Sequence, residues 1–250
     1  MRQRKCAFCA ADAVERGGEH VWDDWINKAL PKTTYRARRR SQDSPLVEYD
    51  TDSLNLKLPV VCADCNHGWM SILSSQVKER FGRAMLDGEP FSLGAKDAAI
   101  LIAFTFMKAV VTDHLLLDHE PFFTRAARER FRTSRAIPPL IKGWFAEFYG
   151  VARMSTKNGL SIIGSSEPGP LYGIEFLSFT YVVGKLTLQL LAPRWKSLSH
   201  RGRRLISLNP NVYWEQAVIL FWPHPGEFLS WPPEKRFGDD MIDTFIESVQ

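Results

Sequence analysis

Four cysteines carry the clearest chemistry in this sequence. They form two Cys-x-x-Cys pairs, and the 250-residue chain contains no others; the pairs are Cys6 with Cys9 and Cys62 with Cys65. Each short loop points two sulfurs at one metal, and two such loops complete the tetrahedral shell that Zn²⁺ prefers. Because a closed four-sulfur shell leaves no open position for water or substrate, the pattern predicts a structural zinc site. Such a site contributes on the order of 10 kcal/mol to the folding of a small module.

Other roles for the thiols remain open from the sequence, namely a thioredoxin-like redox pair or buried free thiols. Disulfide bonds require an oxidising compartment, and the segment from Met1 to Asp12 lacks the apolar run of a secretory signal peptide. The longest apolar stretch, Ala98 to Met107, is much shorter than the ~20 residues that cross a bilayer. We therefore expect a soluble cytoplasmic protein with no membrane partner.

A second group of residues has the chemistry of phosphodiester hydrolysis. That reaction needs a base to deprotonate water, a divalent cation to neutralise phosphate charge, and ligands for the cation. Glu19 and His20 lie between the two cysteine pairs, and Asn66 follows the last cysteine. His20 is a base that works near neutral pH. The Glu19 carboxylate and the Asn66 carbonyl are hard oxygen donors suited to Mg²⁺ or Mn²⁺.

Short elements must hold these residues in place. Residues 22–30 favour a short helix that Pro31 stops, and residues 54–61 alternate like a strand. From Asn66 onward a helix is expected, with apolar residues at helical spacing: Trp69, Leu73, Val77 and Phe81. The zinc would then tie the ribbon to the start of this helix. Residues 31–53 are polar and favour a surface loop.

The positive charge is concentrated near the N-terminal end. Residues 1–40 contain ten Lys and Arg against five Asp and Glu, so they carry +5, while the formal charge of the whole chain is +4. Arginines contact phosphates without reading sequence. We expect four arginines of the predicted loop to contact DNA, namely Arg36, Arg38, Arg39 and Arg40. An ordinary solvated run of charges remains an alternative. Segments 125–135 and 194–204 are also basic, with ordinary surface charge as the favoured explanation.

The rest of the chain predicts a larger α+β domain. A hydrophobic content of 45% is enough for a real core and excludes disorder as the main state. Residues 95–117 favour a buried helix, and Thr124 can cap a second helix at 125–132. β-branched and aromatic runs predict strands, and an amphipathic helix closes the chain: strands at 143–153, 174–183, 185–191, 204–208 and 217–222, and the helix at 239–249. We therefore expect an N-terminal module at 1–88 and a domain at 89–250.

The order of these motifs resembles the HNH endonuclease family. Cys-x-x-Cys, Glu-His-Val and Cys-x-x-Cys-Asn before a helix match its ββα-metal motif, most strongly over residues 6–78. Within the family the chain is similar to a bacterial and phage branch, through Glu19 to Trp25 and through the run from Cys65 to Met70. The resemblance implies that His20 is the general base, that Glu19 and Asn66 bind the catalytic cation, and that the substrate is DNA.

The sequence departs from this family at two positions. Many members have Asp before the histidine and Lys three residues after the Asn, whereas this chain has Glu19 and Trp69. Glutamate is one methylene longer and still reaches a metal, but Trp69 supplies no cation for the phosphate. Simpler roles also stand beside the catalytic ones: a packed histidine for His20, a helix N-cap for Asn66, and a surface position for His67.

The sequence therefore predicts a metal-dependent HNH endonuclease that cleaves phosphodiester bonds in DNA. One alternative is a catalytically inactive zinc-ribbon protein that binds nucleic acid. Another is an effector gated by a partner or ligand on residues 89–250, a region that offers no catalytic constellation and whose expected roles are substrate selection, dimerisation or regulation. A homo-oligomer or a regulatory partner is compatible with each of these.

Overall fold

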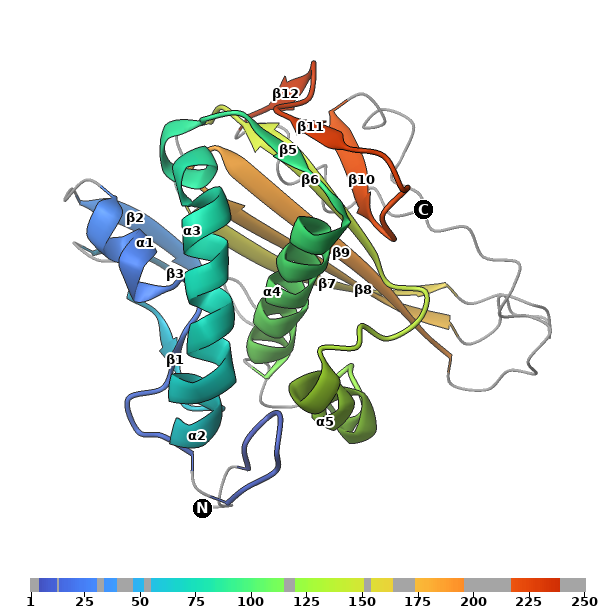
Figure 1. The fold of residues 1–250 in the computed structure, drawn as a ribbon. Coiled ribbons are helices and arrows are strands. Elements are labelled where there is room, and N and C mark those ends of the chain that lie inside the picture. Colours follow the sequence, from blue (N-terminus) through green and yellow to red (C-terminus); the bar gives the residue numbers. More distant parts are fainter. Residues whose placement is uncertain are drawn as a thin grey trace. The chain divides into compact units, whose positions relative to one another are not determined.

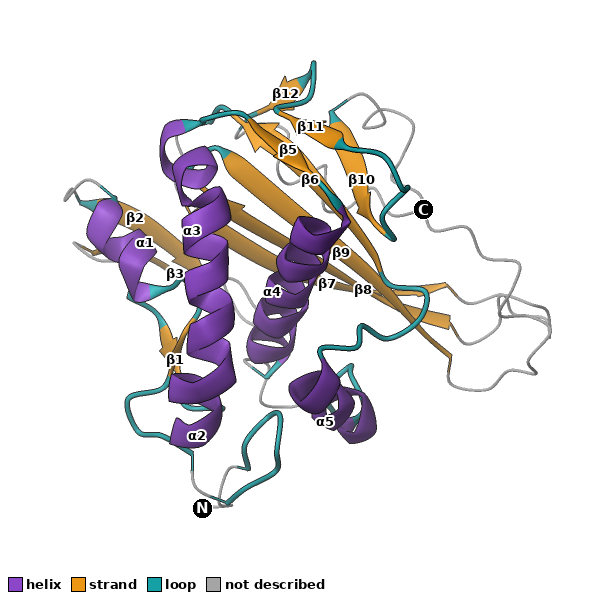
Figure 2. Ribbon diagram, in the orientation of Figure 1, coloured by secondary structure: helices purple, strands orange, loops and turns teal. Residues whose placement is uncertain are grey.

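A computed structural model describes residues 5–12, 14–30, 34–39, 47–51, 55–114, 120–150, 154–163, 174–195 and 217–238. It has a mixed α+β fold with largely antiparallel sheets, as expected (Figures 1 and 2). The strand predicted at 204–208 and the helix predicted at 239–249 lie outside the described residues. None of the helices in those ranges is long and apolar enough to cross a membrane.

Contacts between residues divide the chain into two compact units. The first comprises residues 1–75 and 110–134, and the second comprises residues 76–109 and 135–250. Two of the three divisions fall inside helices, because α3 (Ser71–Asp87) and α4 (Ala95–Asp113) each run from one unit into the other, and the third division follows Ser134. The domain boundary predicted at residue 88 remains a prediction.

In the first unit, a two-residue ribbon carries the Glu-His pair. Strand β1 (Glu19–His20) pairs antiparallel with β4 (Lys57–Leu58), with Glu19 opposite Leu58 and His20 opposite Lys57. Gly18 allows this pairing, because it has φ of +70° and a Cβ placed there would lie 2.8 Å from the Leu58 backbone. Only glycine combines that dihedral with that close approach.

Helix α1 (Asp24–Ala29) confirms the short helix predicted after the ribbon. Asp24 lies in its first turn and pairs with Lys28 at 2.5 Å, the favourable acid-before-base order on a helix. The Asp23 carboxylate accepts hydrogen bonds from Ser74 Oγ at 2.5 Å and from Trp25 Nε1 at 3.3 Å. Both acidic residues thus have structural partners.

The surface loop predicted for residues 31–53 was wrong in its described part. Tyr35–Arg39 forms strand β2 and Val47–Thr51 forms strand β3, and the two pair antiparallel over their full length. The polar composition favoured a loop, but Val47–Thr51 alternates aromatic or β-branched residues with charged ones, and Tyr35–Arg39 begins in the same way with Tyr35, Arg36, Ala37 and Arg38. Alternation of that kind suits a strand with one polar face.

The helix expected from Asn66 begins in two steps. Ala63–Cys65 forms the single turn α2, Asn66–Met70 follows with π-helical hydrogen bonding, and Gly68 interrupts the helical backbone at φ −89° and ψ −114°. Regular α3 begins at Ser71 and buries the apolar positions that the sequence indicated, namely Leu73, Val77 and Phe81.

Two further helices match their predictions closely. Helix α4 is buried at every residue from Leu101 to Asp113. Helix α5 (Arg125–Ser134) begins at the predicted cap, since the backbone N–H of Ala127 donates to Thr124 Oγ1 at 3.2 Å.

The second unit is built on a six-stranded sheet. Its strands are β6 (Lys142–Phe148), β7 (Met154–Ile163), β8 (Ile174–Val183), β9 (Leu186–Trp195), β10 (Val218–Trp222) and β12 (Arg236–Phe237). The order is β10-β6-β9-β8-β7, and β12 pairs in parallel with the end of β6. A separate ladder joins β5 (Phe91–Leu93) to β11 (Leu229–Trp231). Strands β5, β7, β11 and β12 were not predicted.

Helix α4 packs on this sheet (Figure 2). Phe104 meets Tyr181 of β8 edge to face at 5.9 Å. Gly143 of β6 leaves room for Ile102, whose Cδ1 would lie 2.7 Å from a Cβ there. At the β8–β9 turn, Gly184 has φ of +55°, and the next residue, Lys185, donates its N–H to the Met85 carbonyl at 2.8 Å.

Candidate metal centre

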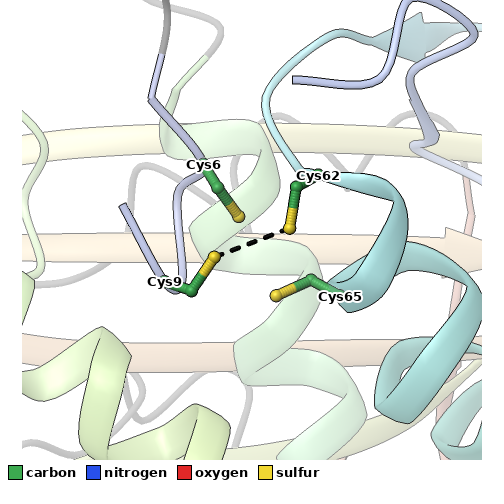
Figure 3. A group of neighbouring side chains, drawn as sticks. All are labelled: Cys6, Cys9, Cys62 and Cys65. Carbon is green, nitrogen blue, oxygen red and sulfur yellow. Dashed lines mark hydrogen bonds between the residues drawn. The ribbon is translucent and has the colours of Figure 1, made fainter. Parts of the chain in front are cut away.

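The four cysteine side chains converge on one point, as the sequence predicted. All four Sγ atoms lie within 4.8 Å of one another, and Cys9 Sγ is 3.5 Å from Cys62 Sγ (Figure 3). With Zn–S bonds near 2.3 Å, a tetrahedral site places its sulfurs about 3.8 Å apart. The observed cluster therefore needs shifts of less than about 1 Å to reach zinc geometry. Three of the sulfurs belong to buried residues and Cys9 is half-buried.

Backbone hydrogen bonds shape both cysteine loops and connect them. The N–H of Cys6 donates to the Ala11 carbonyl at 2.8 Å, and the N–H of Ala10 donates to the Cys6 carbonyl at 3.0 Å. The N–H of Ala7 donates to the Val60 carbonyl at 2.8 Å, which fixes the first loop beside the segment leading to Cys62. Cys9 and Cys62 are 53 residues apart in the sequence, yet the two cysteine pairs form one cluster.

The thiols are electrostatically coupled. The hydrogen bond from the Cys65 thiol lowers the pKa of Cys6 to about 4, and the same bond raises the pKa of Cys65 above its usual value. Burial raises the pKa of Cys9. Four thiolates gathered in one place would accumulate negative charge, which a bound cation offsets. A divalent soft-ligand metal such as Zn²⁺ meets that requirement.

Three aromatic rings from separate segments pack behind the cysteines. Trp69 meets Phe8 edge to face at 4.9 Å and Phe131 at 5.6 Å, and Phe8 lies 6.3 Å from Phe131. Trp69 therefore packs between the first cysteine loop and helix α5, which gives the departure from lysine at this position a structural reason.

An internal arginine secures the first cysteine loop. Arg128 Nη1 donates to the Ala7 carbonyl at 2.5 Å and to His114 Nε2 at 2.9 Å, and Arg128 Nε donates to the Phe123 carbonyl at 3.1 Å. His114 Nδ1 donates to the Val110 carbonyl at 2.8 Å. Burial lowers the pKa of His114, so the ring is neutral and accepts from the guanidinium. Arg128 belongs to the basic segment 125–135, yet its hydrogen-bond partners lie inside the protein.

Glu19 and His20 lie where the ribbon of β1 and β4 places them. Glu19 is buried and His20 is half-buried. The pKa of Asp24 is lowered mainly by its hydrogen bond with Lys28, and the charge of His20 also contributes, so His20 lies within electrostatic reach of Asp24. The catalytic roles assigned to Glu19 and His20 remain predictions.

Asn66 is not an N-cap, because its own backbone is helical with φ −63° and ψ −56°. Its side-chain Nδ2 donates to Glu15 Oε2 at 2.8 Å, and His67 Nε2 lies 2.9 Å from Glu15 Oε1. These two partners, Asn66 first, lower the pKa of Glu15. Glu15 was not predicted as a site residue, since it is 51 residues from Asn66 and belongs to no motif.

The arginines predicted to contact DNA lie on a strand rather than on a loop. Arg36, Arg38 and Arg39 belong to β2, and Arg40 lies outside the described residues. In the register with β3, Arg36 stands opposite Asp50, Arg38 opposite Glu48 and Arg39 opposite Val47. In this register, two of the three arginines of β2 are therefore opposite an acidic residue of β3. Their role in DNA binding remains a prediction.

Comparisons with protein-family models, curated proteins and solved structures found no match to this chain. The chemistry must therefore be argued from the residues. In the part of the chain that the structure describes, the four cysteines are the only group of three or more His, Cys, Asp or Glu side chains positioned to share a metal ion. That group is consistent with a structural zinc site.

Proposed function

We propose that this protein is a metal-dependent endonuclease of the HNH type that cleaves DNA. One observation carries the proposal. A strand bearing Glu19 and His20 pairs with β4, and the chain then passes through Cys62 and Cys65 to Asn66 and helix α3. Strand, strand and helix thus follow in the order of a ββα-metal motif, with the cysteine cluster at the junction between the second strand and the helix.

In the proposed reaction, His20 accepts a proton from a water molecule whose oxygen attacks the phosphorus. The P–O3′ bond breaks and the leaving O3′ takes a proton from solvent water, so the products carry a 5′-phosphate and a 3′-hydroxyl. His20 suits this role because an imidazole changes protonation near neutral pH. His20 is half-buried on a short ribbon, so part of the residue is accessible to solvent.

Glu19 and Asn66 are the proposed ligands of the catalytic cation, Mg²⁺ or Mn²⁺. The donor set fits such an ion, because carboxylate and amide carbonyl oxygens are the hard ligands that Mg²⁺ prefers. Asn66 turns its NH₂ group toward Glu15, which leaves its carbonyl oxygen directed elsewhere. When bound, the cation would neutralise negative charge that develops on the phosphate.

We further propose that Zn²⁺ fills the cysteine cluster and supports this geometry without taking part in the chemistry. Cys65 directly precedes Asn66, and the Asn66 N–H donates to the Cys62 carbonyl at 3.0 Å. Contraction of the thiols around zinc therefore fixes the start of the helix that presents Asn66. Loss of zinc is therefore expected to displace Asn66 and so to abolish cleavage.

The decisive experiment incubates zinc-loaded protein with supercoiled plasmid in Mg²⁺, in Mn²⁺ and in EDTA. We expect nicking or linearisation by the wild type that requires the cation and is lost in His20→Ala. His224→Ala is the matched control, because His224 lies in the second unit and contacts the Leu93 carbonyl. Retarded migration of DNA without strand breaks would instead identify a zinc-ribbon binding protein. Cleavage only after a partner is added would indicate a gated effector.

A further inference from the structure

Glu15 makes two hydrogen bonds at the start of the helix that carries Asn66. Its two carboxylate oxygens are divided between adjacent residues, with Oε2 accepting from Asn66 Nδ2 at 2.8 Å and Oε1 lying 2.9 Å from His67 Nε2. Both distances are those of charge-assisted hydrogen bonds. The Glu15 side chain is 26% exposed and the His67 side chain is 69% exposed, so the contact with Asn66 is the better shielded of the two.

The backbone of Glu15 is as firmly placed as its side chain. Its N–H donates to the Val61 carbonyl at 2.9 Å, directly before Cys62, and its carbonyl accepts from Gly18 at 3.1 Å, directly before Glu19. Glu15 is therefore anchored to the segment that enters the second cysteine loop and to the start of the ribbon.

A carboxylate beside an asparagine side chain selects one of its two orientations. An ionised carboxylate only accepts hydrogen bonds, whereas the asparagine side chain has one donating end and one accepting end. Only the NH₂ end of Asn66 can face Glu15, because its carbonyl would meet another negative oxygen. The planar amide then points Oδ1 away from Glu15. His67 occupies the second Glu15 oxygen and so keeps the carboxylate from rotating away.

We infer that Glu15 is a positioning residue that fixes the amide of Asn66 with its carbonyl oxygen presented to the catalytic cation. This inference rests on the proposed function, in which Asn66 Oδ1 is a cation ligand. Without Glu15 the amide can turn by 180° and present NH₂, which cannot bind a cation. Outer-shell partners that orient ligands in this way typically change metal affinity by about 10-fold to 100-fold.

The test measures the dissociation constant for Mn²⁺ by calorimetry on zinc-loaded protein, together with plasmid nicking. Glu15→Ala is expected to weaken Mn²⁺ binding about 10-fold or more. Glu15→Gln is expected to rescue most of this loss, because the glutamine carbonyl still accepts from the Asn66 NH₂. Glu89→Ala is the matched control, since Glu89 is an exposed carboxylate paired with Arg83. Zinc content and thermal unfolding verify that each variant is folded.

A double-mutant cycle separates positioning from general support. In an Asn66→Ala background, Glu15→Ala is expected to cause no further loss of Mn²⁺ affinity, because no amide remains to orient. A further loss of equal size in that background would overturn the inference, as would a folded Glu15→Ala protein with wild-type affinity. Wild-type protein that neither binds Mn²⁺ nor cleaves DNA would refute the proposed function itself. Wild-type cleavage that needs Asn66 but not Glu15 would refute only the inference.

A spectroscopic measurement reports the amide orientation without any cation. In the ¹H–¹⁵N spectrum of the zinc-loaded protein, the two side-chain NH₂ protons of Asn66 are expected to differ strongly in shift, since one is bonded to a carboxylate. In Glu15→Ala the difference in shift between the two protons should become much smaller, and in Glu15→Gln most of it should remain. An Asn66 amide signal that is unchanged in Glu15→Ala would overturn the inference.

Discussion

Replacement of Arg128 by methionine tests how the first cysteine loop is held. The guanidinium donates to three acceptors in the first unit: the Ala7 and Phe123 carbonyls and His114 Nε2. Methionine keeps the apolar stem and leaves all three acceptors without this donor. At roughly 1 kcal/mol for each lost hydrogen bond, the gross cost is about 3 kcal/mol. Burial lowers the pKa of Arg128, so removing the charge returns part of that cost. We expect a net loss of about 2 kcal/mol.

The assay is urea unfolding of zinc-loaded protein, followed by far-ultraviolet circular dichroism and by zinc release to a chromogenic chelator. Arg125→Met is the matched control on the same helix, because Arg125 is 65% exposed and pairs with Glu129 one turn away. Exposed pairs of this kind contribute about 0.5 kcal/mol or less. If Arg128→Met were no more destabilising than Arg125→Met, or released zinc no faster than the wild type, the assigned role of Arg128 would be refuted.

Three further outcomes follow from the structure. Burial depresses the pKa of His114, so its neutral form stabilises the fold fully above the unfolded pKa near 6.5. This stabilisation is lost as the pH falls toward the lower pKa of the folded state. His114→Gln should therefore flatten the pH dependence of unfolding free energies measured between about pH 5 and 8. Chelation of zinc, or Cys9→Ser, should destabilise the first unit strongly, and Co²⁺ substitution of the wild type should give the absorption bands of a tetrahedral four-thiolate site. Gly184→Ala should destabilise far more than Gly226→Ala in thermal unfolding, because both glycines have positive φ but only at Gly184 would a Cβ strike backbone, 2.0 Å from the Met85 carbonyl oxygen. Equal effects of the two alanines would contradict that reasoning.

Local patterns in the sequence predicted the elements whose cause is local. The cysteine spacing predicted the cluster because each Cys-x-x-Cys loop is a self-contained turn. The apolar run of α4 and the cap at Thr124 are likewise readable from neighbouring residues, and both were confirmed. Strand β8 was predicted at its observed bounds because aromatic and β-branched residues fill it.

The features that were missed depend on distant partners. Strand β7 contains Lys157, Asn158 and Gly159, which weaken a strand pattern, but among the described strands β7 is the last in the sheet, an edge position where such residues are tolerated. Arg128 contacts Ala7 across 121 residues of sequence. Nothing in a basic helical segment distinguishes an arginine that will donate to a distant carbonyl from one that stays in solvent.

The β2–β3 register changes what the arginine run can contribute to DNA binding. Residues directly opposite on antiparallel strands are neighbours, and opposite charges at such positions stabilise each other. Arg36 stands opposite Asp50, whereas Arg39 stands opposite Val47. Each phosphate contact that is lost lowers the slope of log affinity against log salt by about 0.9.

For the proposed DNA complex, we therefore expect Arg39→Gln to reduce that slope by about one and Arg36→Gln to reduce it by clearly less. The measurement is DNA affinity by fluorescence anisotropy over a series of salt concentrations, with Asp50→Asn as the complementary variant. If Asp50 competes with phosphate for Arg36, then Asp50→Asn strengthens DNA binding and steepens the slope. Equal effects of Arg36→Gln and Arg39→Gln, with none from Asp50→Asn, would show that strand pairing does not limit these arginines and that the whole run acts as a simple charge track.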